Sequence, residues 1–490
     1  MAELECRLAV PAEGSSKELV PESSCFQRAW TCFLQLILSS KLRILRFSRK
    51  IWKLGVDDPR RVFHCLKVGV ALTLVSLFYY MRPLYDGVGG TAMWAIMTAV
   101  VVFEYTVGGT ISRGINRGVA TFLAGSLGFG VHALAVQSGQ KAETIIRSFS
   151  IFLLEPDMYL LAAAGLATFS RFVPTVKARF EYGVTVFILT LSLVSVSGYR
   201  VDKVIEMAHR RLITIAIGGS MCMLTSMLIC PVWAGEDLHS LVIRNMEKLA
   251  TSLDGCVVEY FDYGKSPDGA EESCQRLQGY RCLFNTKATE EALANFARWE
   301  PPHGCFSFRH PWKQYLKIGA ALRFCAYCLD ALDASTNSQI KITTDELGVK
   351  KHLRDAFTRL SSKSCEVLKE LAVTLKTMRR SSKIEFLVGE THAAVQHLQN
   401  ALKSIPDDLK HMVLQSPTSA TEARLETGTS PAAASKPNNY NNKIAWMETV
   451  LPLITLTSLI IEITARIEGV VHEVDELARL ADFKPAVDST

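Results

Sequence analysis

Six basic side chains lie at the ends of long apolar runs, or between them, in the first half of this 490-residue chain. They are Arg113, Arg117, Lys177, Arg179, Arg200 and Arg211. An anion that crosses a low-dielectric slab needs positive charge along its path, and rings of Arg or Lys supply that charge without proton transfer. The positions of these cations therefore predict a path for anions.

Arg211 is the leading candidate because it comes directly before the apolar run that begins at Leu212. A charge at that depth should face a bundle interior or water rather than lipid. A second interpretation is that Arg211 reaches the lipid headgroups while its stem stays in the apolar layer.

The other five cations also have two open interpretations. Arg200 would line the external mouth of a pore. Lys177 and Arg179 would line the internal mouth, and Arg113 and Arg117 would gather anions from the cytosol. Basic connections also arise simply because Lys and Arg accumulate on the cytosolic side of a membrane.

Three acidic residues, Asp86, Asp202 and Glu206, fall on the opposite side of the predicted bundle. Carboxylate oxygens are the ligands that hard cations require, so these residues are candidates for sensing Al³⁺ or Ca²⁺ from outside. The interpretation that we favour is that they are solvated acids, because Lys203 and Arg210 nearby would repel a trivalent cation.

Trp299, Glu300 and Pro301 form a short motif in the polar second half of the chain, between two predicted helices. The residue before a proline avoids helical geometry, so a rigid turn is expected there. Two roles remain open. Either Glu300 pairs with a basic partner and couples this half to the pore, or the motif is a structural turn.

Enzymatic chemistry is not indicated. The sequence has no phosphate-binding glycine loop, no metal-ligand cluster and no recognisable triad, so we expect neither an enzyme nor a bound cofactor. Cys325 and Cys328 form a lone C-x-x-C pair, which favours core cysteines over zinc. The net charge of +6 is modest, and no basic run is interleaved with aromatic residues, so nucleic acid is not an expected partner.

The cations are positioned by several long apolar runs, each of spanning length or close to it. These runs are Leu66–Met81, Gly89–Val107, Gly118–Val136, Ser148–Ala167, Gly183–Ser197 and Leu212–Val232. A bilayer core requires about 20 apolar residues in a helix, and lipid leaves no backbone group unpaired. The sequence therefore predicts an all-α membrane domain over residues 57–233, with about six transmembrane helices.

The connections Gly108–Gly118 and Ser170–Phe180 are basic and fall on the same side as the N-terminal segment if six helices alternate. This places both termini in the cytosol. The fourth run departs from the pattern, because Glu155, Pro156 and Asp157 would lie at membrane depth, where carboxylates and a helix-breaking proline are costly. That run is either kinked with a hydrated face or shorter than drawn.

Residues 1–56 form a polar N-terminal segment that ends in a basic stretch from Lys41 to Lys53. The start of this segment is not a secretory signal, because it has no apolar core after a basic start. The short apolar patch Trp30–Leu38 and the basic stretch suit a helix that lies on an anionic membrane surface. A solvated basic segment before the first span is the other interpretation. Asp57, Asp58 and Pro59 indicate the start of that span.

The second half reads as amphipathic helices with charges between apolar residues at spacings of three and four. We expect helices near 237–263, 283–297, 311–333, 344–376, 382–403 and 443–481. These form a cytosolic helical domain over 234–403, a flexible linker over 404–442 and a C-terminal cytosolic helix and tail over 443–490. The last helix is apolar at its start, but its charges favour packing on the cytosolic bundle over a seventh span.

Several short motifs, in this order and spacing, closely resemble the plant aluminium-activated malate transporter family of anion channels. They are Asp57-Asp58-Pro59-Arg60-Arg61, Ala92-Met93-Trp94-Ala95, Asn116-Arg117-Gly118-Val119-Ala120-Thr121, Thr168-Phe169-Ser170-Arg171-Phe172, Ser195-Val196-Ser197-Gly198-Tyr199-Arg200, Cys230-Pro231-Val232-Trp233-Ala234-Gly235 and Trp299-Glu300-Pro301. The resemblance is dense from Leu54 to Phe308 and looser elsewhere. It also implies a pore arginine at Arg211.

The resemblance implies a homodimer with six spans per subunit, a pore at the subunit interface and a helical cytosolic domain. It implies gated, passive transport of malate, and often of inorganic anions, across a lipid bilayer. We expect a multi-pass protein of the plasma membrane, with the vacuolar or another endomembrane as the alternative. The competing hypothesis is a membrane-anchored helical scaffold or regulatory subunit that does not conduct.

Overall fold

The computed structural model describes residues 25–81, 92–139, 156–198, 204–262, 278–307, 309–339, 349–414 and 439–485. The chain divides into two compact units, Met1–Leu66 and Lys67–Thr490. Apart from isolated β-bridges, such as the one between His303 and Phe306, the regular elements of these residues are helices. The predicted all-α class is confirmed for this part of the chain.

The first unit holds α1 (Cys25–Asp57) and the beginning of α2 (Pro59–Tyr80). The apolar patch and the basic stretch both lie in one continuous helix, α1. The predicted start of α2 is present, because the Asp58 carbonyl accepts the backbone N–H of Arg61 at 3.2 Å and its carboxylate accepts Arg61 Nε at 3.0 Å. Pro59 occupies the first turn, where its missing N–H costs no hydrogen bond.

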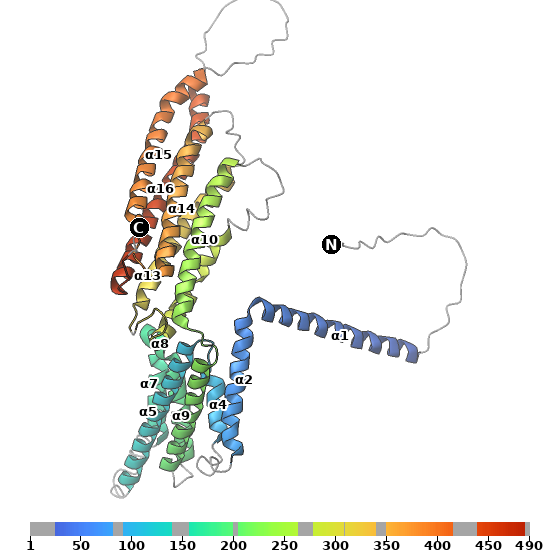
Figure 1. The fold of residues 1–490 in the computed structure, drawn as a ribbon. Coiled ribbons are helices and arrows are strands. Elements are labelled where there is room, and N and C mark those ends of the chain that lie inside the picture. Colours follow the sequence, from blue (N-terminus) through green and yellow to red (C-terminus); the bar gives the residue numbers. More distant parts are fainter. Residues whose placement is uncertain are drawn as a thin grey trace, which may run out of the picture. The chain divides into compact units, whose positions relative to one another are not determined.

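The predicted membrane domain continues with α4 (Ala92–Val102), α5 (Val107–Gly139), α7 (Pro156–Ser170), α8 (Pro174–Gly198) and α9 (Val204–Leu228) (Figure 1). Each predicted apolar run overlaps one of α2, α4, α5, α7, α8 and α9. Within the described residues, His209–Leu228 alone is long and apolar enough to cross a membrane, and Met93–Val102 is a shorter apolar helix. The count of six spans therefore stays a prediction.

These helices pack through small side chains. In Lys67–Thr490, α5 packs against α8 and α9, α4 packs against α9, and α7 packs against α8. A Cβ added to Gly218 of α9 would lie 2.6 Å from the Ala95 carbonyl oxygen of α4. Such close backbone approach through small residues is the usual packing mode of helices in lipid.

These helices differ from those of a water-soluble bundle in the side chains that they expose. Large apolar side chains point outward, for example Met93, Phe122, Leu166 and Leu224, which are between 53% and 72% exposed. The buried side chains include many polar ones: Lys67, Thr98, Thr106, Thr110, Ser112, Asn116, Arg117, Thr121, Thr190, Thr214, Thr225 and Ser226. They lie beside buried apolar side chains such as Ala71, Val75 and Ala95. An apolar exterior around an interior that holds polar groups suits a lipid environment.

Two connections predicted as loops are helical. Arg113 and Arg117 do not lie in a loop over 108–118, because α5 begins at Val107 and includes both. Lys177 and Arg179 lie in the first two turns of α8, which begins at Pro174, and not in a loop that continues to residue 180. Proline at the first position of a helix is favourable, which explains the early start of α8.

The predicted fourth run also needs correction. Within the described residues, α7 begins at Pro156, so the proline lies in its first turn and not in its middle. Asp157 falls in the first turn of the same helix. Glu155 lies outside the described residues. The helix α7 has 15 residues, which agrees with the shorter of the two interpretations.

The second half forms a helical bundle of α10 (Ala234–Asp262), η3 (Gln278–Asn285), α12 (Lys287–Ala297), α13 (Trp312–Gln339), α14 (Val349–Thr377), α15 (Lys383–Leu414) and α16 (Asn439–Leu480). In Figure 1, α10, α14, α15 and α16 run side by side, and the contacts agree, since α13 packs against α16 and α14 packs against α10 and α15. The core is a continuous apolar cluster that includes Leu238, Met246, Leu322, Leu368 and Ile467.

The last helix is part of this bundle. From Leu456 to Leu477, α16 contributes buried residues to the same apolar cluster as α10 and α13. The predicted linker over 404–442 is too long at both ends, because α15 continues to Leu414 and α16 begins at Asn439. Residues 415–438 lie outside the described part of the chain.

Candidate functional site

Two of the predicted cations meet one aromatic side chain. Arg113 and Arg117 are four residues apart on α5, so they share a face of the helix. The Arg117 guanidinium donates a hydrogen bond from Nη1 to the hydroxyl of Tyr182 on α8 at 3.3 Å. The guanidinium carbon of Arg113 lies 5.7 Å from the centroid of the same ring. The contacts between α5 and α8 therefore bring two positive charges together.

Arg117 is the more deeply placed of the two, with only 8% of its surface exposed. Its buried Nε has no hydrogen-bond partner in the part of the chain that the structure describes. Guanidinium groups carry five donors in a fixed fork that matches anions. A buried guanidinium with an unused donor is an arrangement that favours a bound anion.

Arg113 is partly neutralised by Glu104. The two form an ion pair, and Arg113 Nη1 also donates to the Val101 carbonyl at 3.4 Å. From the sequence alone, Glu104 is expected either to pair with a cation or to cap a water pocket, and the structure shows the ion pair. However, α4 ends at Val102, so Glu104 lies in the connection to α5 and not inside a span.

Arg211 lies near the start of the apolar stretch His209–Leu228 of α9 and is half-buried. Its guanidinium carbon is 4.7 Å from the ring centroid of Trp94 on α4, a distance typical of a cation–π contact. This contact fixes the side chain inside the helix bundle, although it also uses one face of the guanidinium.

Lys177 and Arg179 have exposed side chains at the start of α8. Arg179 belongs to the same region as Arg117, since its carbonyl accepts a hydrogen bond from Asn116 Nδ2 at 3.5 Å. The remaining predicted site residues cannot be placed: Asp86, Arg200 and Asp202 lie outside the described residues, as does the side chain of Glu206.

Lys67 was missed by the sequence analysis. It lies on α2, only 1% exposed, near the Cys230 thiol. The available signal was a lone lysine in the second position of the apolar run Leu66–Met81. A cation inside such a run marks a functional position more often than a structural one.

Glu300 joins two helix N-termini. Its Oε1 accepts the backbone N–H of Ala234 at 2.6 Å and of Gly108 at 3.2 Å, and its Oε2 accepts the N–H of Gly235 at 3.0 Å. Gly108 is in the first turn of α5, and Ala234 and Gly235 begin α10. A buried carboxylate therefore caps a helix of the predicted membrane domain and the first helix of the second half at once.

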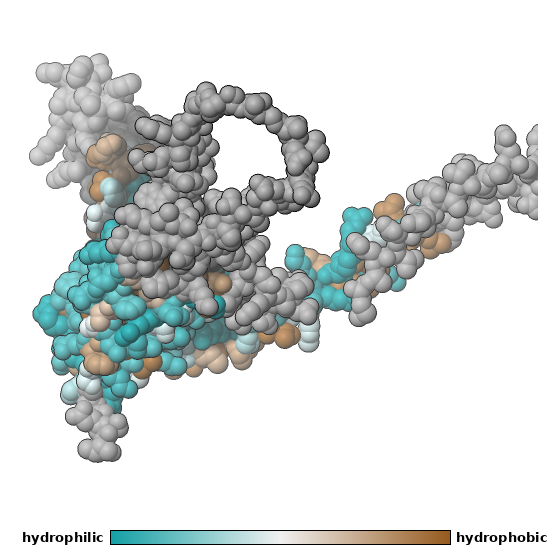
Figure 2. Space-filling model, turned by 90° about the horizontal axis from the view of Figure 1, so that it is seen from above, coloured by the Kyte–Doolittle hydropathy of each residue, from teal (hydrophilic) through white to brown (hydrophobic). Residues whose placement is uncertain are grey.

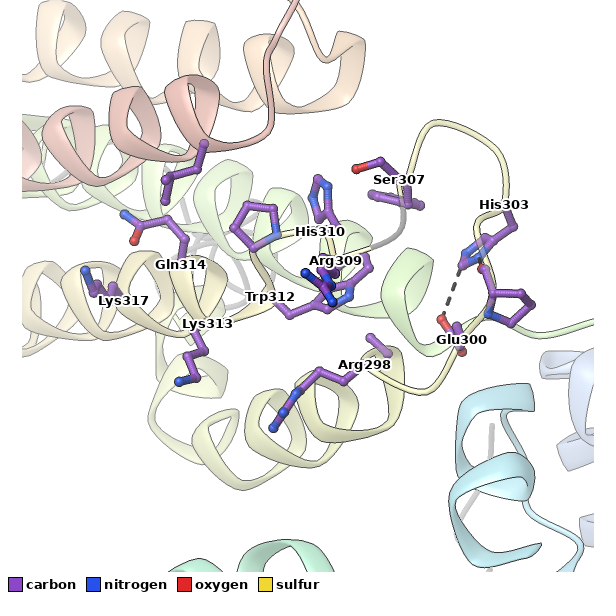
Figure 3. A pocket seen from close by; sticks show the side chains of 15 residues that line it. Arg298, Glu300, His303, Ser307, Arg309, His310, Trp312, Lys313, Gln314 and Lys317 are labelled. Atoms are coloured by element: carbon purple, nitrogen blue, oxygen red, sulfur yellow. Dashed lines mark hydrogen bonds and ion pairs between the residues drawn. The ribbon is translucent and has the colours of Figure 1, made fainter. Parts of the chain in front are cut away.

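The predicted basic partner of Glu300 is replaced by these N–H groups. The nearest titratable group is His303, whose Nε2 lies 3.9 Å from Oε2 (Figure 3). Burial raises the pKa of Glu300, although the three N–H donors and His303 act in the opposite direction. The His303 ring stacks on Trp233 with centroids 3.9 Å apart, which holds the turn after Pro301 against the start of α10.

The backbone around Glu300 is too closely packed for side chains. A Cβ on Gly108 would lie 2.3 Å from the Phe296 carbonyl oxygen of α12. A Cβ on Gly235 would lie 2.4 Å from the ring of Trp312 on α13. Glycine at both positions lets the two helix starts reach the carboxylate.

A pocket of about 630 Å³ adjoins Glu300 and has a basic rim. Figure 3 shows its lining, with Arg298 directly after α12, Arg309 from the following loop and Lys313 and Lys317 from α13. Beneath it, the Tyr315 hydroxyl contacts His239 Nδ1 at 3.0 Å and His310 Nε2 at 3.3 Å.

Burial lowers the pKa of both His239 and His310 to about 4, so both rings are neutral at physiological pH. Burial also raises the pKa of the Tyr315 phenol. This neutral His–Tyr–His contact joins α10, the loop and α13 beside the Glu300 turn. No group of three or more potential metal ligands occurs within the described residues.

Comparison with known proteins identifies the family. The sequence model of the family "Aluminium activated malate transporter" matches residues 52–443. Aluminum-activated malate transporter 10 of Arabidopsis thaliana is 48% identical over 98% of this chain and 95% of its own length. Aluminum-activated malate transporter 2 of the same plant is 43% identical over 90% of this chain and 78% of its own length.

A relative from another species agrees with these two. Aluminum-activated malate transporter 1 of Triticum aestivum is 40% identical over 74% of this chain and 78% of its own length. All of these relatives are named as transporters, so the expectation that the chain is not an enzyme is confirmed. The chain is a member of the aluminium-activated malate transporter family of membrane proteins.

Proposed function

We propose that this protein is a gated channel that passes malate and inorganic anions down their gradients. The observation that carries the proposal is the buried guanidinium of Arg117, with an unused donor, beside Arg113 in a bundle whose outer surface is apolar. Relatives named as malate transporters support malate as a substrate.

The polar interior favours conduction over a purely structural role. Hydroxyl and amide side chains such as Thr110, Ser112, Asn116 and Thr121 lie along the buried side of α5. Hydroxyls can replace part of the hydration shell of an anion, and the arginines supply the net positive charge. Weak binding at several such positions admits an anion and still releases it.

The proposed assembly is a homodimer with six spans per subunit and the pore between subunits. The basic side of the bundle would face the cytosol, together with both termini and the helical bundle of the second half. We place the protein in the plasma membrane, with an endomembrane such as the vacuolar one as the alternative.

We assign the coupling of the cytosolic bundle to the pore to Glu300. The residue binds the first turn of α5, and Arg117 lies nine residues further along the same helix, about 14 Å at 1.5 Å per residue. The same carboxylate binds the first turn of α10. A movement of α10 would therefore be transmitted to the helix that carries both arginines.

The test is a current measurement in a heterologous cell with malate as the main anion. We expect a malate current from the native chain, reduced at least tenfold by Arg117→Gln, since a binding charge worth about 1.4 kcal/mol or more is lost. Arg211→Glu should reduce the current or change its selectivity. Arg210→Glu is the matched control, because Arg210 is an exposed neighbour on the same helix.

Each outcome decides between the proposals. Unchanged current in Arg117→Gln and Arg211→Glu would keep the channel and remove these residues from its path. A native chain that reaches the membrane and passes no anion under any stimulus would overturn the channel in favour of the non-conducting scaffold.

A further inference from the structure

The helix α1 exposes an unusually apolar surface. Phe33, Leu36, Ile44, Phe47 and Trp52 are between 55% and 76% exposed. In Figure 2 the described residues of α1 carry both brown, hydrophobic and teal, hydrophilic atoms. An exposed apolar surface of this extent marks an interaction site.

The apolar and basic side chains of α1 lie on different faces. At 100° per residue, Phe33, Ile37, Ile44 and Ile51 fall within about 40° of one another. Leucine, phenylalanine and tryptophan residues extend this face on both sides, with the exception of Leu42, which lies among the cations. The helix is therefore amphipathic along its length.

The opposite face of α1 is cationic. At the same 100° per residue, Arg43, Arg46, Arg49, Lys50 and Lys53 fall within an arc of about 120° centred opposite the apolar face. Lys41 is the exception, since it lies on the apolar side. The sequence from Cys25 to Val56 contains no Asp or Glu, and the only acid of the helix is Asp57 at its C-terminal end.

We propose that α1 lies in the surface of the bilayer, with its apolar face among the acyl chains and its cations on anionic lipid headgroups. The inference rests on the proposed function only in that α2 is taken as the first span. Because α1 ends at Asp57 and α2 begins at Pro59, the C-terminal end of α1 is tethered next to that span.

Charge favours lipid over a protein partner from this chain. A protein surface that covers α1 would need a row of carboxylates to match its cations. The chain has a net charge of +6, so a second copy would bring further positive charge and no acidic excess. Anionic headgroups supply the charge, and Trp52 suits the interface between headgroups and acyl chains.

Two serines of α1 provide matched variants. Ser48 lies near the centre of the apolar face, only about 20° from Ile37 and 40° from Ile44, whereas Ser39 lies on the cationic face. Ser48→Glu and Ser39→Glu make the same change in net charge. Only Ser48→Glu places a carboxylate where acyl chains should be. The two variants therefore distinguish insertion of the apolar face into the bilayer from a simple change in net charge.

The experiment is hydrogen–deuterium exchange of the full-length protein in nanodiscs of phosphatidylcholine with or without 30 mol% phosphatidylserine. We expect amides 33–56 to exchange at least about tenfold more slowly with phosphatidylserine, since each cation near an anionic surface contributes about fivefold in binding. Ser39→Glu should lower that protection about fivefold, and Ser48→Glu should abolish it.

Other outcomes would overturn the proposal. Equal protection of amides 33–56 from exchange in both lipid mixtures and in detergent would mean that protein covers α1, either a second copy or another part of the chain. Rapid exchange in both nanodiscs would leave α1 solvated. Equal effects of the two glutamate variants would exclude insertion of the apolar face. Exchange is measured without any current, so failure here is separate from failure of the channel proposal.

Discussion

Replacing Glu300 is the sharpest test of the connection between the two halves of the large unit. Glu300→Ala would remove the acceptor of three backbone N–H groups at Gly108, Ala234 and Gly235. A buried donor without a partner costs about 1–3 kcal/mol, so the three together cost about 3–9 kcal/mol. Since a folded protein is stable by only about 5–15 kcal/mol, this change should abolish a stable fold or nearly so.

Glu300→Gln should be much milder. The amide oxygen can replace Oε1 and accept from Gly108 and Ala234, and only the N–H of Gly235 would face the NH₂ group. The loss is then about 1–3 kcal/mol for one donor. Part of this loss is offset, because burial raises the pKa of Glu300 and the neutral amide avoids the desolvation of a charge.

The assay is thermal unfolding of the purified full-length protein in nanodiscs, with the current as a second measurement. The expected order of melting temperature is native, then Glu300→Gln, then Glu300→Ala. The pH dependence adds a second criterion. The pKa of Glu300 is higher in the folded than in the unfolded protein, so its protonation stabilises the fold at low pH, and this stabilisation is lost as the pH rises through the folded pKa. The native protein should therefore lose stability relative to Glu300→Gln as the pH is raised over this range.

A Glu300→Ala protein that melts with the native one would refute the reasoning, because it would mean that the three N–H groups find water or other partners at no cost. Normal stability with lost current would instead separate coupling from folding. A melting temperature of Glu300→Gln below that of Glu300→Ala would contradict the assignment of oxygens as acceptors.

Two further predictions concern the surroundings of Glu300. Gly235→Ala should destabilise the fold by about 1–3 kcal/mol, because its Cβ would lie 2.4 Å from the Trp312 ring; a smaller partner, Trp312→Leu, should restore part of the melting temperature. His239 and His310, with pKa values of about 4, should make stability fall as pH drops from about 6.5 to 4, since the unfolded chain then binds protons that the folded one does not, by about 3 kcal/mol for each ring. His310→Gln should reduce the pH dependence of the melting temperature to about half, because His239 still contributes, and an unchanged slope would contradict the assignment.

The sequence predicts the helical class well. Long apolar runs indicate membrane helices, and apolar residues at spacings of three and four indicate amphipathic helices. It fails at the start of α5. The residues between the apolar runs Gly89–Val107 and Gly118–Val136 suggest a loop, and glycine at positions 108 and 109 is a weak helix former. The structure requires glycine at position 108 because α5 packs closely against α12. A Cβ on residue 108 would lie only 2.3 Å from the Phe296 carbonyl oxygen. The contact with α12 therefore explains why glycine occurs at the start of α5, which helix propensity alone would assign to a loop.

The ligands of Glu300 could not be predicted for a related reason. Its three donors lie 192, 66 and 65 residues away and are backbone groups, which no residue type reveals. The expectation that Glu300 meets positive charge is consistent with the structure, but the charge comes from helix N-termini and not from a basic side chain. Each helix N-terminus carries about half a positive charge, so α5 and α10 together supply roughly the charge of one lysine. Unlike a lysine, a helix terminus cannot swing away from its carboxylate. A single buried Glu300 can therefore join two helices more rigidly than an ion pair between side chains, which is the property that a coupling between the bundle and the arginines of α5 requires.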